Sequence, residues 1–209
     1  MQIQPTGGSP FQPPQQVEQM QGTAQKLLTH LTAHAGSSQS QYDLDQLQEQ
    51  MQELQTLNLS SNMNDLVGVA SSQFQTMRES PTPSTVALFQ GTCTTLSETL
   101  STPQVNVPAL LAQNQLSALA HALHAQMHDA HQLSDSPACE ALLETMQVPL
   151  STLQQLASSS QLASDPAELA TALTEYYEDH FGDPKTTTVG SVNQFSEILD
   201  SLNIQLLNP

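Results

Sequence analysis

Apolar residues recur every three or four positions through most of the chain, and the clearest case lies between Pro108 and Leu133. Within it the apolar positions at steps of four, three and four are Leu116, Ala120, Leu123 and Met127. At about 100° per residue this spacing places them on one broad face of an α-helix. Pro108 suits the first helical position, because the N–H that it lacks would have no partner there. The pattern predicts a helix of about 26 residues, on the order of 39 Å long, as the spine of a bundle.

The same period predicts further helices on both sides of this one, in 17–35, 44–54, 63–77, 85–101, 137–146, 153–156, 166–181 and 191–202. The clearest start is Asp165-Pro166-Ala167-Glu168, which has a capping residue, a proline at the first position and a glutamate three residues after the cap. The sequence SPTPS at 80–84 predicts a firm break, and Pro149 is expected to interrupt its helix. No convincing internal repeat is visible. The expected fold is all-α, an irregular bundle of about six to eight helices.

The first sixteen residues differ from the rest, because they contain four prolines and two glycines and show no helical period. We expect 1–16 to be a disordered, Pro/Gln-rich arm. The remainder, 17–209, is predicted to be a single helical domain with possible sub-boundaries near 80–84 and 158–164. Phe11 lies among prolines and is a candidate for docking into a groove of a partner.

The charge balance excludes several classes of partner. Lys26, Arg78 and Lys185 are the only basic residues among 209, against 20 acids, and the net charge is −17. Binding to nucleic acid or to an anionic membrane surface requires cationic side chains, so neither is expected. A basic protein partner is electrostatically favoured, and a homo-oligomer is compatible with the pattern. No apolar run approaches about 18 residues, so no membrane insertion is expected.

Targeting and redox signals are sparse. The N-terminus has no basic region followed by an apolar stretch, which predicts a cytoplasmic protein or one exported without a classical signal peptide. Cys93 and Cys139 allow one disulfide at most. We expect both to be buried free thiols.

Four histidines form a stripe on the long helix. His121, His124, His128 and His131 are separated by three, four and three residues, so they share one face. They fit a polar border of a packed helix face. They also fit a pH-responsive surface, because histidine titrates near pH 6.5, and they are weak candidates for a metal site. One helix cannot complete a tetrahedral shell, so a metal would need ligands from elsewhere.

An acidic and aromatic segment near the end of the 166–181 helix is the other candidate site. Its partner-binding candidates are Glu175, Tyr176, Tyr177, Glu178, Asp179 and His180. An anion at a helix C-terminus interacts unfavourably with the helix dipole, which costs roughly 0.3–1 kcal/mol for each charge. A residue that is locally unfavourable in this way can mark a functional site. The segment fits a solvated acidic face, a docking site for a basic partner, or a site for a hard cation.

The chain contains none of the motifs that mark phosphate binding, nucleophilic catalysis or paired-cysteine chemistry. The sequence therefore predicts a non-enzymatic helical interaction or assembly protein that needs no cofactor. The composition of roughly the first 25 residues resembles that of type III secretion substrates, which implies an exported or delivered protein. A virion or appendage structural subunit is one alternative. A metal-binding protein or metal-dependent enzyme that uses the histidine stripe is another.

Overall fold

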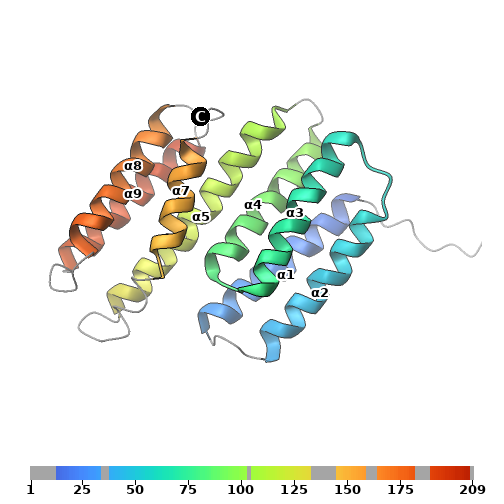
Figure 1. The fold of residues 1–209 in the computed structure, drawn as a ribbon, viewed down its shortest axis with the longest axis horizontal. Helices are drawn as coiled ribbons and strands as arrows, with labels where there is room; N and C mark the ends of the chain where they lie inside the picture. The colour runs from blue at the N-terminus through green and yellow to red at the C-terminus, as the bar shows by residue number, and fades with distance from the viewer. Residues whose placement is uncertain are drawn as a thin grey trace, which may run out of the picture.

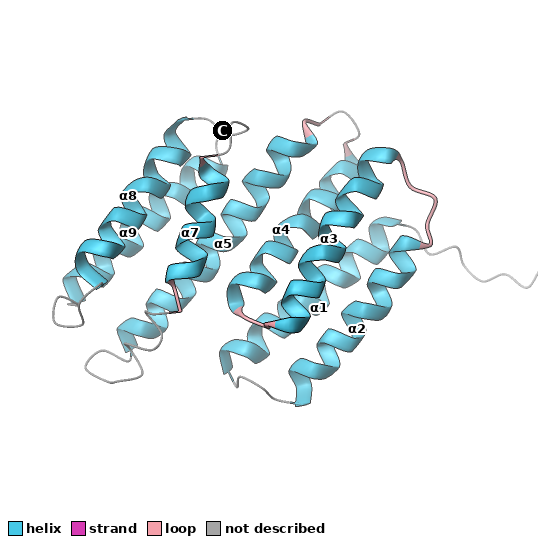
Figure 2. Cartoon of the chain, viewed as in Figure 1, coloured by secondary structure: helices cyan, strands magenta, loops and turns pink. Residues whose placement is uncertain are grey.

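The computed structural model describes residues 13–33, 38–102, 105–132, 145–158, 164–181 and 189–207. Within these ranges the chain forms eight α-helices and no strand, which confirms the predicted all-α bundle (Figures 1 and 2). The helices are α1 (Pro13–Ala33), α2 (Ser38–Gln55), α3 (Ser61–Glu79), α4 (Pro83–Ser101), α5 (Val107–Gln132), α7 (Gln147–Ala157), α8 (Ser164–Phe181) and α9 (Val189–Leu207). Among the described helices, none combines the length and apolarity that spanning a bilayer requires.

The first four helices form the N-terminal lobe. Each packs against its neighbour in sequence, and α1 also packs against α4, which closes the arrangement (Figure 1). The core residues recur at steps of three and four: Val17, Met20, Ala24 and Leu27 on α1; Leu44, Leu47, Met51 and Leu54 on α2; Val86, Phe89, Cys93 and Leu96 on α4. This is the knobs-into-holes period of an up-and-down four-helix bundle.

The helices α5, α7, α8 and α9 form the C-terminal lobe, which has the same arrangement. Again each helix packs against the next, and the first packs against the last. Its core includes Leu116, Leu123 and Met127 on α5, Leu150 and Leu153 on α7, Leu173 and Tyr177 on α8, and Phe195, Leu199 and Leu202 on α9. The two hydrophobic cores divide broadly between α4 and α5, with Ala87 of α4 in the C-terminal core and Leu111 of α5 packed against the N-terminal core. The possible sub-boundaries near 80–84 and 158–164 stay a prediction.

The two lobes meet where α4 crosses α5 at Gly91. A Cβ atom on Gly91 would lie 2.6 Å from the Cα of Gln115 and 2.7 Å from the carbonyl oxygen of Asn114. No larger residue fits this approach without movement of a backbone. Beside it, the amide of Gln115 donates to the hydroxyl of Thr92 at 2.9 Å, and both side chains are buried. The close approach and the bonded polar pair together fix the relative position of the lobes.

Three boundaries differ from the predictions. The helix α1 begins at Pro13, so the last four residues of the expected arm are helical; prolines in a first turn remove only N–H groups that have no partner there. The helix α4 begins at Pro83, because Thr82 and Thr85 form a reciprocal capping box. Pro149 lies within the first turn of α7 and does not interrupt it, for the same reason as in α1. The helix expected in 137–146 falls mainly outside the described residues.

Candidate functional site

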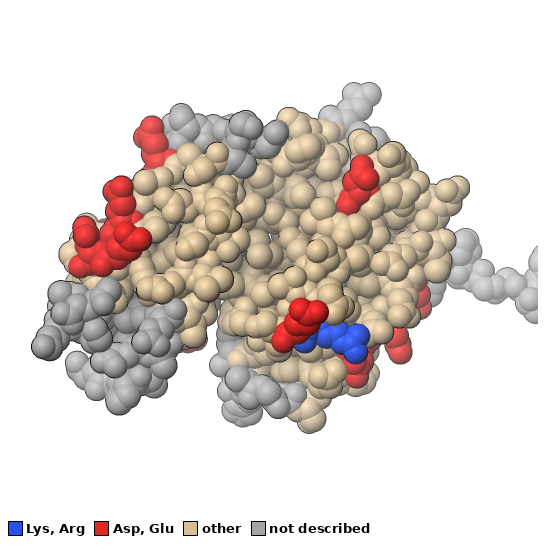
Figure 3. All heavy atoms as spheres, viewed as in Figure 1, with Lys and Arg blue, Asp and Glu red and all other residues tan. Residues whose placement is uncertain are grey.

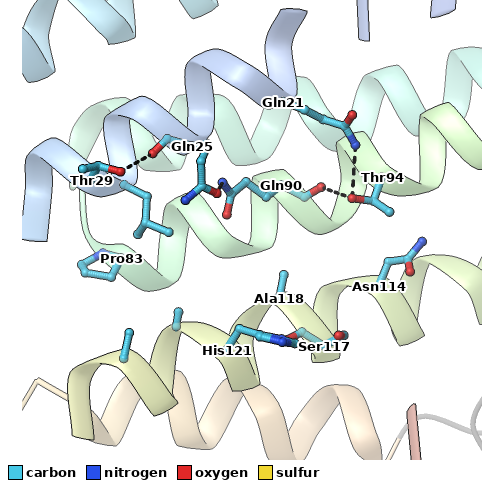
Figure 4. A pocket seen from close by; sticks show the side chains of 13 residues that line it. Gln21, Gln25, Thr29, Pro83, Gln90, Thr94, Asn114, Ser117, Ala118 and His121 are labelled. Carbon is cyan, nitrogen blue, oxygen red and sulfur yellow. Dashed lines mark hydrogen bonds between the residues drawn. The ribbon is translucent and has the colours of Figure 1, made fainter. Parts of the chain in front are cut away.

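A groove with a volume of about 640 Å³ runs along the junction of the lobes, with α1 and α5 as its walls and α4 between them (Figure 4). The lining residues are Gln21, Gln25, Leu28 and Thr29 from α1, Pro83, Gln90 and Thr94 from α4, and Asn114, Ser117, Ala118, His121, Ala122 and Ala125 from α5. It is larger than a second hollow of about 400 Å³ between the starts of α3 and α5.

Small side chains on α5 leave this space open. Both walls pack on α4, but the residues that α5 turns toward the groove include Ser117, Ala118, Ala122 and Ala125. These side chains are too short to fill the space between α5 and the glutamines of α1. The groove is thus a consequence of the residue sizes along one stripe of α5.

The polar groups of the groove are held by hydrogen bonds between its helices. The amide of Gln21 donates to the hydroxyl of Thr94 at 3.3 Å, and the amide of Gln90 donates to the carbonyl oxygen of the Gln25 side chain at 3.0 Å (Figure 4). The hydroxyl of Thr94 also donates to the main-chain oxygen of Gln90 at 3.1 Å. These contacts join α1 to α4 along the groove and orient its amides.

The lining contains no Asp, Glu, Lys or Arg, in a chain that carries 20 acids. Its only histidine, His121, has Nδ1 2.7 Å from the main-chain oxygen of Ser117. Because that contact is to the backbone, His121 and Ser117 do not form the hydroxyl-to-imidazole contact of an activated nucleophile. The groove therefore offers neutral hydrogen-bonding groups and small apolar contacts.

The three stripe histidines with described side chains do not converge on a site. His121 and His128 are exposed, while the half-buried His124 has Nε2 3.6 Å from a carboxylate oxygen of Asp200 on α9. The side chain of His131 lies outside the described residues. Within the part of the chain that the structure describes, no three His, Cys, Asp or Glu side chains are placed to hold a metal ion. Among the stripe histidines whose side chains the structure describes, only His121 lines the groove.

The acidic and aromatic segment divides into two faces of α8. Glu175, Glu178 and Asp179 are exposed, and acidic side chains gather over this side of the C-terminal lobe (Figure 3). Tyr177 is only 4% exposed and belongs to the core, so it is not available to a partner at the surface.

Tyr176 is half-buried, and its ring packs against that of His180, with centroids 4.2 Å apart and the two planes tilted by 43°. Burial raises the pKa of its phenol. The aromatic half of the predicted segment is therefore largely structural. Phe11 lies outside the described residues.

Cys93 is a fully buried residue of the N-terminal core, and burial raises the pKa of its thiol. An apolar environment disfavours the thiolate, which is the reactive form. This agrees with the expected buried free thiol, while Cys139 lies outside the described residues.

Sequence reasoning did not identify the groove. Its amide residues come from three helices, and glutamines are spread over the whole chain, so no single segment distinguishes these from solvated ones. The only local signals were Gly91 inside a helix and the small residues along one stripe of α5.

The chain matches no protein-family model, and no curated protein or solved structure matches it significantly.

Proposed function

We propose that the protein is a non-enzymatic interaction protein that binds a helical segment of a protein partner in the groove between α1 and α5. The observation that carries this proposal is the groove itself, in which three helices present oriented amides and small side chains without a charged group. A helix that inserts into a groove of other helices is a recurring mode of peptide recognition. A helix bound in this groove would pack against α1, α4 and α5 in the way that the chain's own helices pack against one another.

The dimensions suit a short helix. The lining spans residues 21–29 of α1 and 114–125 of α5. At 1.5 Å per residue these segments are about 12 Å and about 16 Å long, which corresponds to two to three helical turns. The occupant would need small or amide-bearing residues at every third or fourth position, because the groove's own polar groups recur at that spacing.

The biological context is also a proposal. An exported or delivered protein that acts by binding a host or assembly partner agrees with the N-terminal composition. A virion or appendage subunit would use the same groove to hold a neighbouring protein. The partner's identity separates these contexts, whereas the groove is common to both.

A selection experiment tests the proposal and requires no identified partner. A display library of randomised helix-forming peptides of about 14 residues is selected on the wild-type protein. Binding is then measured to Gln25→Trp, which fills the groove from the α1 wall, and to Gln155→Trp, which changes an exposed glutamine on α7 that lines none of the hollows described. We expect the selected peptides to lose binding to Gln25→Trp and keep it for Gln155→Trp. Equal binding to both variants, or no selected peptide, would contradict the proposal.

A further inference from the structure

The ends of the groove differ in charge from its middle. The hydrogen bonds between Gln25 and Gln90 and between Gln21 and Thr94 show that α1 and α4 run antiparallel along the groove. If this pairing is continued by one helical turn along both helices, Glu18 of α1 comes level with Glu98 of α4. Both side chains are exposed. Two carboxylates from different helices therefore lie at one end of the neutral lining.

Asn114 confirms that Glu98 borders the groove. Its amide lines the groove and donates to the Glu98 carboxylate at 2.8 Å. At the other end, Ala125 is the last lining residue of α5, and exposed Asp129 follows it by one turn. The nearest basic residue on the α1 wall, Lys26, is exposed and does not line the groove.

We infer that the groove takes a helix whose inserted face is uncharged and whose two ends carry Arg or Lys. This inference rests on the proposed function and names the chemistry of its partner. The uncharged lining would leave a buried charge without a partner, so the central two turns of the occupant must be neutral. Glu18 and Glu98 at one end, and Asp129 at the other, attract cations at the rim, where solvent still reaches them.

The charge of the whole molecule argues against a second copy as the occupant. With a net charge of −17, two copies repel each other, whereas a basic segment is drawn toward the protein. The acidic face of α8, with Glu175, Glu178 and Asp179, also attracts bases, and Glu175 lines a smaller hollow of about 320 Å³ among the described residues. A basic partner could be held by either surface, so the test must separate them.

The test uses three synthetic peptides of about 16 residues that share a neutral Ala/Ser/Gln centre and have Arg, Gln or Glu at both ends. Affinity is measured by fluorescence anisotropy in low salt and at 0.3 M salt, after the helicity of each free peptide has been determined. We expect the Arg peptide to bind about tenfold more tightly than the Glu peptide in low salt, with most of the difference lost at 0.3 M.

Two neutralised variants locate the effect. In Glu18→Gln/Glu98→Gln/Asp129→Asn the preference for Arg ends should fall to about twofold or less. The matched variant Glu175→Gln/Glu178→Gln/Asp179→Asn removes the same number of charges from α8 and should keep the preference. If the α8 variant loses the preference and the groove variant keeps it, basic segments dock on α8 and the inference is wrong.

Gln25→Trp separates failure of this inference from failure of the proposed function. It should abolish binding of all three peptides. Suppose that Gln25→Trp abolishes binding, but wild type binds the Arg, Gln and Glu peptides with equal affinity. The groove then binds helices, and only the inference about basic ends is wrong. If the peptides bind Gln25→Trp as well as wild type, or none binds wild type, both proposals fail.

Discussion

The two lobes have the same helix order and the same core period, yet their interiors are held together differently. In the N-terminal lobe, polar side chains form a ladder between α1 and α2, at steps of seven residues along α1. Gln16 donates to Glu53 at 2.8 Å, Thr23 accepts from Gln50 at 3.2 Å, and His30 Nδ1 lies 2.5 Å from Asp43 Oδ2. The C-terminal lobe instead gathers Tyr176, Tyr177, Phe181 and Phe195 into one aromatic cluster.

The last helices of the lobes differ on their outer faces. Two residues after core Phe89, α4 has Gly91, which lets α5 approach. Two residues after core Phe195, α9 has exposed Glu197. One residue without a side chain thus lets α5 pack closely on α4, whereas a charged residue stands exposed at the corresponding place on α9. The groove exists only because the first lobe continues into a second.

The largest expected effect comes from the aromatic cluster. The ring of Phe195 lies 5.7–6.5 Å from the rings of Tyr176, Tyr177 and Phe181. Among the described residues, Phe89 has one such neighbour, Phe74, at 6.2 Å. Both phenylalanines are fully buried, so each change to alanine should cost about 3–5 kcal/mol. We expect Phe195→Ala to cost more than Phe89→Ala in urea unfolding followed by circular dichroism. The reverse order would show that the aromatic cluster does not stabilise its lobe as described.

The junction of the lobes should be the next most sensitive place. Gly91→Ala forces a methyl group against the backbone of α5, and overpacking of this kind costs about 1–3 kcal/mol. The matched change Gly68→Ala, on α3 with no atom within 4 Å of the added carbon, should stabilise the protein by up to about 1 kcal/mol. We therefore expect the two substitutions to change the free energy of unfolding in opposite directions. A Gly91→Ala protein as stable as wild type would mean that the crossing is looser than described.

The polar ladder should have a smaller effect. Asp43 is 1% exposed and His30 is partly exposed, so Asp43→Ala removes a buried acceptor and should cost about 1–2 kcal/mol. The control Asp45→Ala changes an exposed carboxylate on the same helix and should stay within about 0.5 kcal/mol of wild type. If the two variants lose the same stability, the ladder does not contribute.

The smallest effect concerns Cys93 and appears only in alkali. Because burial raises the pKa of its thiol, the folded protein keeps the proton while an unfolded thiol loses it above about pH 8.5. The stability contributed by the protonated thiol is thus complete below that value and falls as the pH rises. Between pH 7.5 and 9.5 wild type should lose about 1 kcal/mol more than Cys93→Ala. If the free energy of unfolding depended on pH in the same way in both proteins, the thiol would lie in a less apolar environment than described.

The sequence predicted the helices well and the site poorly, for physical reasons that particular residues show. Core positions such as Leu123 and Leu47 follow the helical period, which depends only on local spacing. The first turns at Pro13 and Pro149 were misjudged, because prolines can open a helix as well as end one. The groove depends on the register of α1, α4 and α5, and no segment of sequence contains that register. Histidines at regular spacing predicted a candidate site, yet of those with a described side chain only His121 lines the groove.

The most direct test of the account is to locate the bound helix. The chain contains no tryptophan, so a single introduced tryptophan reports from one place. Gly22→Trp puts the reporter on α1 beside Gln21 and Gln25, at an exposed position that does not line the groove and where an added Cβ has no atom within 4 Å, and Gln155→Trp puts it on α7. During titration with the Arg-ended peptide, we expect a saturable change in emission at Gly22→Trp and none at Gln155→Trp, with both proteins binding by anisotropy. Binding without any change at Gly22→Trp would contradict the proposed site, because the helix would then lie outside the groove.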